Sequence, residues 1–232
     1  MVRILILREA QAAARTADDL AARGHEPLVL PLESSQAIAG PAPAGAFAGF
    51  AATSARAVPA LAAAFPGDAR PVFAVGERTG AALAAAGFPD VRVAAGEAQS
   101  IGRLAFAAGF GGADTILYAA GRPRTGTLET ALSAAGVGCR VWEVYETIAL
   151  RPERAAVVAA LGAGPPDAVL LLSAGQAATY GDLVARFADL FTPPPQILAL
   201  SARIAAALPP NLAETAQLSR DTRLVSLFER LD

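Results

Sequence analysis

Side chains that could bind an anion follow apolar runs at three places in the sequence. Thr53 and Ser54 follow "FAGFAA", Gly76 and Thr79 lie in "VGERTG" after "PVFA", and Ser173 follows "AVLLL". If each run is a strand that leads into a helix, these side chains and the unpaired backbone N-H groups beside them would bind negative charge. The alternative is that the serines are helix N-caps. Pro59 predicts that the helix after Ser54 starts late or is kinked.

Two arginines and a tyrosine offer further chemistry. The stretch "AGRPRTGT" (120–127) joins a predicted strand to a predicted helix. It lacks the order and the lysine of a phosphate-binding P-loop. Arg122 and Arg124 remain candidates for a carboxylate clamp, because guanidinium groups bind carboxylates in a bidentate manner, or they are solvated turn residues. Tyr145 ends the run "CRVWEVY" and is a candidate proton or hydrogen-bond donor, or a packing residue at a domain junction.

The composition excludes several classes of function. All 19 basic residues are arginine and the net charge is -2, which excludes lysine chemistry and argues against a nucleic-acid partner. One cysteine, Cys139, and one histidine, His25, cannot build a disulfide framework or a Cys/His zinc site. No apolar run approaches the roughly 20 residues of a membrane helix, and "ILIL" is broken by Arg8 and Glu9. We expect a soluble cytoplasmic protein without a metal or other cofactor.

The candidate residues require strands that alternate with helices. A strand, a polar turn and a helix recur six times along the chain, and Gly24, Gly87 and Gly136 each follow a helix at a position that suits a left-handed backbone. Such alternation predicts an α/β fold with mainly parallel sheets covered on both faces. Ligands of such sheets bind beyond the carboxyl ends of the strands, where the candidate turns lie.

Two segments interrupt this alternation. "ESSQAIAGPAPAGAFAGF", which begins at Glu33, is rich in Gly, Pro and Ala, and "ETIALRPERA" (146–155) is extended and contains Pro152. Either the outer parts of the chain form one domain with the middle block inserted, or the chain forms one continuous sheet. Periodicity alone does not choose between them.

The order of these motifs resembles the uroporphyrinogen-III synthase family nearly from end to end. The similar stretches are "ILILREAQAAARTADDLAARGHEPLVLPLE", "FAGFAATSARAV", "VFAVGERTGAALAAAGF", "ILYAAGRPRTGTLETALSAAGVGCRVWEVYET" and "DAVLLLSAGQAA". The resemblance implies two doubly wound parallel-sheet domains, flavodoxin-like or Rossmann-like, joined by two extended linkers. The first domain would comprise residues 1–36 and 156–232, and the inserted domain residues 37–155.

The implied reaction is the cyclisation of hydroxymethylbilane, a linear tetrapyrrole with many carboxylates, to uroporphyrinogen III. Water is lost and the terminal pyrrole is inverted in an interdomain cleft of a monomer. Tyr145 would assist departure of the hydroxyl group as a proton or hydrogen-bond donor. Substrate contacts would come from these residues: Arg8, Thr53, Ser54, Arg56, Gly76, Thr79, Arg122, Ser173, Ala174, Gly175 and Ser201.

The sequence departs from the family pattern at two positions. Leu7 stands where a threonine usually precedes the arginine of the first strand, and Ile204 stands where a threonine is common in the last repeat. The loss of a hydroxyl at Ile204 would suit a rival function, a non-catalytic tetrapyrrole sensor of the same fold. A second rival is a hinge-closing binding protein for a small acidic metabolite.

Overall fold

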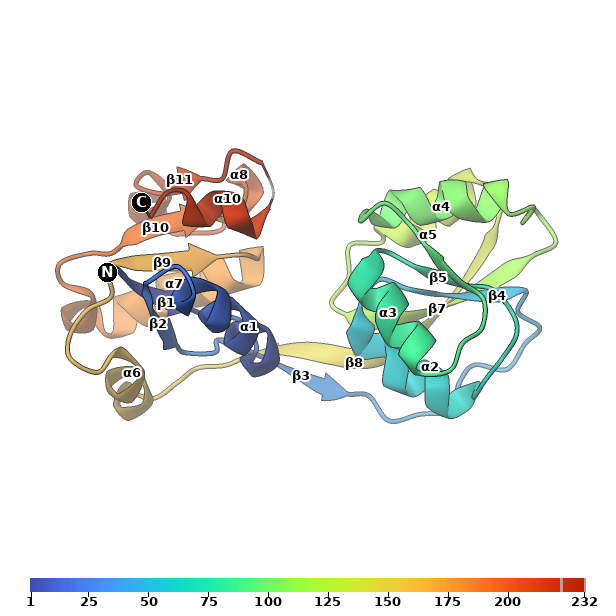
Figure 1. Cartoon of the computed structure of the whole chain (residues 1–232), viewed down its shortest axis with the longest axis horizontal. Helices are drawn as coiled ribbons and strands as arrows, with labels where there is room; N and C mark the ends of the chain where they lie inside the picture. Colours follow the sequence, from blue (N-terminus) through green and yellow to red (C-terminus); the bar gives the residue numbers. More distant parts are fainter. Residues whose placement is uncertain (222, 232) are drawn as a thin grey trace. The chain divides into compact units, whose positions relative to one another are not determined.

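The chain folds into two compact units in the computed structural model, which describes residues 1–221 and 223–231. The terminal unit comprises Met1–Ser35 and Ile148–Asp232, and the inserted unit comprises Gln36–Thr147. In Figure 1 the terminal unit is drawn in blue and in yellow-brown to red, and the inserted unit in light blue to yellow. Because the two units have separate sheets and separate cores, each is described by itself.

The terminal unit is a parallel five-stranded sheet with the strand order β11-β10-β9-β1-β2. Its strands are β1 (Arg3–Ile6), β2 (Glu26–Val29), β9 (Ala168–Leu171), β10 (Gln196–Ala199) and β11 (Gln217–Leu218). Its helices are α1 (Ala10–Ala21), α6 (Arg154–Leu161), α7 (Ala174–Arg186), η2 (Ala188–Phe191), α8 (Ala202–Ala205), α9 (Pro210–Ala213) and α10 (Leu224–Phe228). The order corresponds to that of flavodoxin-like sheets.

The side chains of β1 and of the residue after it point alternately to the two faces of the sheet, and helices cover both faces. Leu5 and Leu7 pack with apolar residues of α6, α7 and α8, whereas Ile4 and Ile6 pack with residues of α1 and α10. Successive side chains of a strand point to opposite faces, so a run of four apolar residues supplies both cores at once. Figure 1 shows α1 and α7 on different sides of β1 and β9.

The inserted unit is a six-stranded sheet with the order β3-β8-β7-β4-β5-β6. The strands of this sheet are β3 (Glu33–Ala37), β4 (Gly49–Ala52), β5 (Val72–Ala74), β6 (Val91–Val93), β7 (Thr115–Arg122) and β8 (Gly138–Ala149). Both unit boundaries fall within strands, because Glu33–Ser35 and the last two residues of β8 belong to the terminal unit. Its helices are η1 (Ala55–Ala57), α2 (Val58–Ala64), α3 (Glu77–Ala85), α4 (Ala98–Ala107) and α5 (Thr127–Ala134). The five strands from β4 to β8 are parallel and follow a Rossmann-like order.

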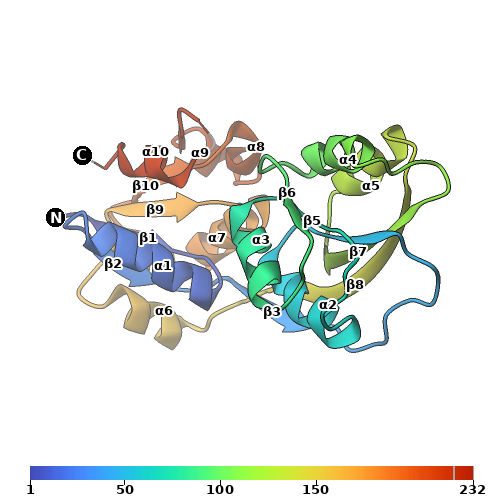
Figure 2. The same ribbon diagram turned by 45° about the vertical axis from the view of Figure 1, so that its right-hand side comes forward.

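Helices cover both faces of this second sheet as well. Phe50 and Leu117 pack on the side of α2 and α3, and Ala51 and Ile116 pack on the side of α4 and α5. Figure 2 shows the two helix pairs on opposite sides of the strands. The late helix start expected from Pro59 is present, because the 3-10 turn η1 precedes α2 and Pro59 lies in the first turn of α2.

The segment 148–155 belongs to the terminal unit, and the expected boundary after residue 155 is wrong by the length of this segment. β8 continues as a strand to Ala149, and the backbone N-H of Leu150 then donates to the carbonyl of Leu32. Arg151 bonds Asp182 of α7 at 3.0 Å. These bonds hold the segment against the terminal unit, which composition could not show. The first boundary, after Ser35, lies one residue from the expected position.

Gly102 brings α4 and α5 into direct backbone contact. A Cβ atom added at Gly102 would lie 2.5 Å from the carbonyl oxygen of Ala131, closer than any side chain tolerates. A Gly102→Val variant must therefore separate the two helices. We expect a loss of about 2 kcal/mol of stability, as for other overpacked cores. Thermal unfolding followed by the fluorescence of Trp142, the single tryptophan of the chain and a residue of the inserted unit, measures the effect.

Gly111→Val is the matched control for this experiment. A Cβ atom at Gly111 would meet no atom within 4 Å, and its φ is not positive. We expect the unfolding midpoint of this variant to stay close to that of the unchanged protein. Equal midpoints for the two variants would contradict the close approach of α4 to α5.

Candidate functional site

The strand orders place one switch point in each sheet. In the terminal unit the chain moves from β1 to β2 on one side and from β9 to β10 and β11 on the other, so the switch point lies between β1 and β9. In the inserted unit it lies between β4 and β7. Ligands of open parallel sheets bind beyond the carboxyl ends of the strands at these points. A ligand site is therefore expected beside one of these two strand pairs.

Predicted site residues lie at the switch point of the terminal unit. Arg8 follows β1, and its Nη1 donates to Thr16 Oγ1 at 3.0 Å. Ser173 follows β9 and caps α7, since its Oγ accepts the backbone N-H of Gln176 at 3.1 Å. Ala174 and Gly175 form the first turn of α7, where backbone N-H groups lack partners within the helix. The N-cap interpretation of Ser173 is thus confirmed, and substrate binding there stays a prediction.

Ser201 lies one strand further along the sheet. It follows β10 at the N-cap position of α8, a helix of four residues, and makes no side-chain cap bond. Ile204, the departure from the family pattern, is only 5% exposed and packs in the same apolar cluster as Leu7. Core packing therefore accounts for the apolar side chains at both departures.

At the inserted unit's switch point, Thr53 and Ser54 follow the end of β4. The hydroxyl groups of Thr53 and Tyr118 are 2.7 Å apart, which joins β4 to β7 through side chains. Ser54 caps η1 and accepts the backbone N-H of Arg56 at 3.3 Å. The guanidinium carbon of Arg56 lies 5.9 Å from the centroid of the Tyr145 ring, within the range of a cation-π contact.

Gly76 and Thr79 follow the next strand, β5, and lie at the start of α3. Gly76 is the N-cap residue of α3 with an extended backbone, and a Cβ there would lie 3.7 Å from Gly96 Cα. Thr79, in the first turn of α3, is only 3% exposed. Its hydroxyl therefore offers little surface to a ligand, and neither residue borders the pocket that lies at the switch point.

That pocket, called here the tyrosine pocket, has a volume of about 220 Å³ and lies within the inserted unit. Its walls come from the residue after β4, from β7 and the loop that follows it, from β8, and from the starts of α4 and α5. The residues that line it are Thr53, Ala98, Tyr118, Gly121, Pro123, Arg124, Thr125, Gly126, Thr127, Leu128, Glu129 and Tyr145. Of the predicted site residues, Thr53 and Tyr145 meet here.

A β-bulge places Tyr145 over the pocket. Ala120 pairs with Glu143, but the next residue, Gly121, pairs with Tyr145, so Val144 is the extra residue on β8. A Cβ atom at Gly121 would lie 2.3 to 2.5 Å from atoms of the Tyr145 ring, including the phenol oxygen. The ring thus lies directly against the bare backbone of Gly121. The bulge and the glycine together determine where the phenol can point.

Arg122 and Arg124 hold carboxylates of the protein itself. Arg122 Nη2 bonds Glu146 Oε2 at 2.8 Å, and its Nη1 lies 3.5 Å from Glu143. Arg124 Nε bonds Glu129 Oε1 at 2.7 Å, and its Nη1 bonds Glu143. A substrate carboxylate must compete with these glutamates. Arg122 does not line the tyrosine pocket, whereas Arg124 does.

Burial and hydrogen bonding shift two pKa values in the pocket. Burial raises the pKa of the Tyr118 phenol, and the hydrogen bond between Tyr118 and Thr53 opposes this effect only in part. The hydrogen bond to Glu129 raises the pKa of Arg124, with further help from Glu143. Tyr118 is therefore an uncharged donor and Arg124 a fixed cation across the physiological pH range.

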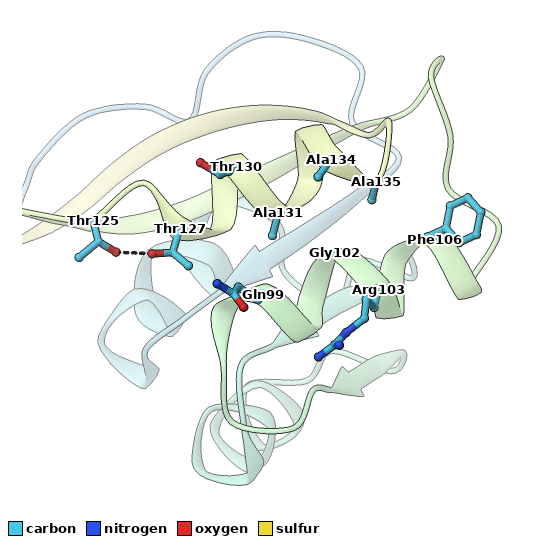
Figure 3. A pocket seen from close by; sticks show the side chains of 10 residues that line it. All are labelled: Gln99, Gly102, Arg103, Phe106, Thr125, Thr127, Thr130, Ala131, Ala134 and Ala135. Atoms are coloured by element: carbon cyan, nitrogen blue, oxygen red, sulfur yellow. Dashed lines mark hydrogen bonds between the residues drawn. The ribbon is translucent and has the colours of Figure 1, made fainter. Parts of the chain in front are cut away.

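Figure 3 shows a second, larger groove of about 810 Å³ on the outer side of α4 and α5. Gln99 and Arg103 of α4 and Ala131 and Ala134 of α5 line it, with Thr125 and Thr127 at one end hydrogen-bonded to each other at 2.8 Å. Only these two threonines also line the tyrosine pocket. The groove arises where small side chains let the helices approach, and it contains no acid or tyrosine, so the smaller pocket is the better candidate for chemistry.

Sequence reasoning missed Tyr118 and Gly121, although both lie in the quoted run "ILYAAG". The run by itself indicates only an apolar strand, and Tyr118 is indeed only 4% exposed. The signal that could have found it is a hydroxyl side chain near the end of the strand next to β4. That neighbour relation becomes visible only with the strand order.

The described part of the chain gives no sign of a metal centre or a membrane helix. No group of three or more His, Cys, Asp or Glu side chains in residues 1–221 and 223–231 is arranged to hold a metal ion. In the same ranges, every helix is too short or too polar to cross a membrane.

Gly121→Ala tests the placement of Tyr145. The new Cβ would occupy the space of the phenol ring, so we expect the ring to rotate away and its NMR signals to shift. The chain has three tyrosines, so tyrosine-selective labelling gives three resolvable sets of signals. In the control Gly112→Ala, the nearest atom to the new Cβ lies 3.9 Å away. Unchanged Tyr145 signals in Gly121→Ala would contradict the contact.

Comparison with known proteins identifies the family. The model of the family described as "Uroporphyrinogen-III synthase HemD" matches residues 14–220. No match was found among curated proteins. Among solved structures, uroporphyrinogen-III synthetase from Helicobacter pylori has a TM-score of 0.65 at 16% identity, covering 100% of this chain and 98% of that chain.

A mutant uroporphyrinogen III synthase from Thermus thermophilus has a TM-score of 0.56 at 18% identity, covering 100% of this chain and 97% of that one. At such identities the structural likeness establishes the shared fold. The family match extends over most of the chain and includes the residues of the tyrosine pocket. The chain therefore belongs to the uroporphyrinogen-III synthase family.

Proposed function

We propose that this chain converts hydroxymethylbilane to uroporphyrinogen III, as a cyclising hydro-lyase. The reaction breaks the bond between the terminal methylene carbon and its hydroxyl group, forms a carbon-carbon bond that closes the macrocycle, and inverts the last pyrrole. One molecule of water is lost and no electrons are exchanged with another molecule. The chemistry thus requires no redox cofactor.

The observation that carries the proposal, beside the family itself, is the position of Tyr145. Its phenol lines a pocket at the switch point of the inserted unit, together with the hydroxyls of Thr53 and Tyr118. Hydrogen-bond donors in a small pocket suit a leaving hydroxyl group, which needs a proton as its bond to carbon breaks.

The protons and electrons of the proposed steps balance. The pyrrole nitrogen pushes electrons toward the methylene carbon, the carbon-oxygen bond breaks, and Tyr145 gives its proton to the departing oxygen. The resulting cation is attacked by the carbon of the last ring that already bears the bridge to the third ring, which gives a spiro intermediate. The bond between that carbon and the bridge then breaks, the last ring turns over, and its unsubstituted alpha carbon attacks the bridge cation. Loss of the proton from this alpha carbon restores Tyr145. Because the ionisation is intrinsically easy, the main contribution of the protein is to hold the substrate in a folded conformer.

The carboxylates of the substrate need binding sites away from the reacting carbon. Candidates are the N-H groups of Ala174 and Gly175 at the start of α7, with Ser173 and Arg8 at the same switch point. Helix N-termini bind anions through unpaired N-H groups and a partial positive charge. These contacts, and an interdomain cleft that would unite them with Tyr145, remain predictions. A monomeric state and a cytoplasmic location belong to the same proposal.

A non-catalytic sensor is the less favoured alternative. Its support is the apolar residue at 204, but the burial of Ile204 in the core explains that side chain without loss of function. A Tyr145 held in place by a bulge and a facing glycine favours catalysis over passive binding.

The decisive assay is product analysis. Freshly prepared hydroxymethylbilane closes spontaneously to the symmetrical type I isomer, so we expect the purified chain to redirect the product to the type III isomer. Chromatography of the oxidised products measures the ratio. Type I product alone, at the spontaneous rate, would contradict the enzyme assignment.

Replacement of Tyr145 by phenylalanine tests the role of its phenol. The ring and its contact with Gly121 are kept while the donor is lost, so we expect kcat to fall by about 10²-fold, as for removal of a general acid, with unchanged thermal stability. Steady-state formation of the type III isomer gives kcat. A kcat equal to that of the unchanged protein would remove Tyr145 from this role.

A further inference from the structure

The tyrosine pocket contains a second tyrosine whose position has no assigned purpose. Tyr118 comes from β7 and Tyr145 from β8, and both line the pocket beside Gly121. The third tyrosine of the chain, Tyr180, is buried in α7 of the terminal unit. The inference below rests on the proposed function, because it concerns the same leaving group.

The size of the pocket limits which part of the substrate can enter. A volume of 220 Å³ is below the range of about 300 to 1,000 Å³ that is usual for complete ligands. A linear tetrapyrrole has four rings with carboxyalkyl arms and cannot fit. One ring end can, and the end that must meet the Tyr145 phenol is the one that bears the hydroxymethyl group.

The hydroxyl groups of Thr53 and Tyr118 can donate one hydrogen bond to a third group in addition to the one between them. Each hydroxyl has one proton to donate, and their mutual bond of 2.7 Å uses one of the two. Among the side chains of the described residues, neither hydroxyl has another hydrogen-bond partner. Both residues line the pocket, so the remaining donor is available to a bound group.

The charges around the pocket suit an uncharged substrate group. Arg124 bonds Glu129 and Glu143, and Glu143 also lies 3.5 Å from Arg122. Arg56 lies over the Tyr145 ring. An incoming carboxylate must therefore compete with the glutamates for a guanidinium, whereas a hydroxymethyl group enters without displacing an ion pair.

We propose that the Thr53–Tyr118 hydroxyl pair donates a hydrogen bond to the departing oxygen of the hydroxymethyl group, as a second donor beside Tyr145. The proton stays on the pair, and Tyr145 alone transfers one. The pair stabilises the oxygen as negative charge develops on it, which lowers the barrier to ionisation. Burial also keeps the Tyr118 phenol protonated, since it raises its pKa.

Tyr118→Phe and Thr53→Val test the pair. Each variant keeps the shape, removes one hydroxyl and leaves the other without the partner that orients its proton. We expect each to lower kcat about tenfold, the effect of one hydrogen bond, with little change in KM. Tyr180→Phe is the matched control, because it removes the hydroxyl of a buried tyrosine outside the pocket. We expect it to have unchanged kinetics.

Thr53→Ser should restore kcat, because serine supplies the same hydroxyl. Thermal unfolding, measured on every variant, shows whether a lower rate reflects damage to the fold. If Tyr118→Phe does not fold, the comparison of Thr53→Val with Thr53→Ser decides. A kcat unchanged in both Tyr118→Phe and Thr53→Val, or a rise in KM alone, would overturn the proposal.

The unchanged protein distinguishes this failure from a failure of the proposed function. If it makes the type III isomer and the variants match it, only the hydroxyl pair is wrong. If it yields type I product at the spontaneous rate, the function itself is wrong. In a double variant with Tyr145→Phe, we expect a loss smaller than the product of the single losses, because both donors act on one oxygen.

Discussion

The parallel pairing of β7 with β4 on one side and with β8 on the other is the constraint on which the candidate site depends. It brings Thr53, Tyr118 and Tyr145 from distant parts of the sequence to one end of one sheet. The register is fixed because both faces of β7 are buried, so a slip of one residue would turn each core side chain to the opposite face. The single extra residue on β8 then selects which side chain faces Gly121.

Much of the fold could be predicted from the sequence because it depends on local patterns. The turn glycines illustrate this, since Gly24, Gly87 and Gly136 all have the positive φ expected after a helix. The family resemblance also gave the correct fold class. The bulge, the bond between Thr53 and Tyr118 and the glutamates that occupy Arg122 and Arg124 depend on register between strands. A single sequence does not show which residues meet across strands, so it indicated neither the place of Tyr118 in the pocket nor the glutamates that pair with Arg122.

All Lys or Arg positions of this chain are arginine, and this choice shapes the electrostatics of the molecule. Arg70 forms a bidentate pair with Asp68 while its guanidinium carbon lies 4.6 Å from the centroid of the Phe50 ring. Arg56 lies over Tyr145 in a similar manner. A planar, delocalised cation pairs with acids and stacks on rings at once, which an ammonium group cannot do. The protein thereby keeps fixed positive charges near aromatic groups without a basic net charge.

The terminal unit is built from two separate stretches of the chain, and this affects the order in which the protein can fold during its synthesis. β1 is made first, but its neighbour β9 lies beyond the whole inserted unit in the chain. During translation the nascent N-terminal strand is therefore left with an open edge toward β9, while Gln36–Thr147 can acquire its own sheet. Since domains tend to fold as they emerge from the ribosome, the inserted unit should complete first. A chaperone that shields the apolar β1 until then would bind the segment Arg3–Ile6.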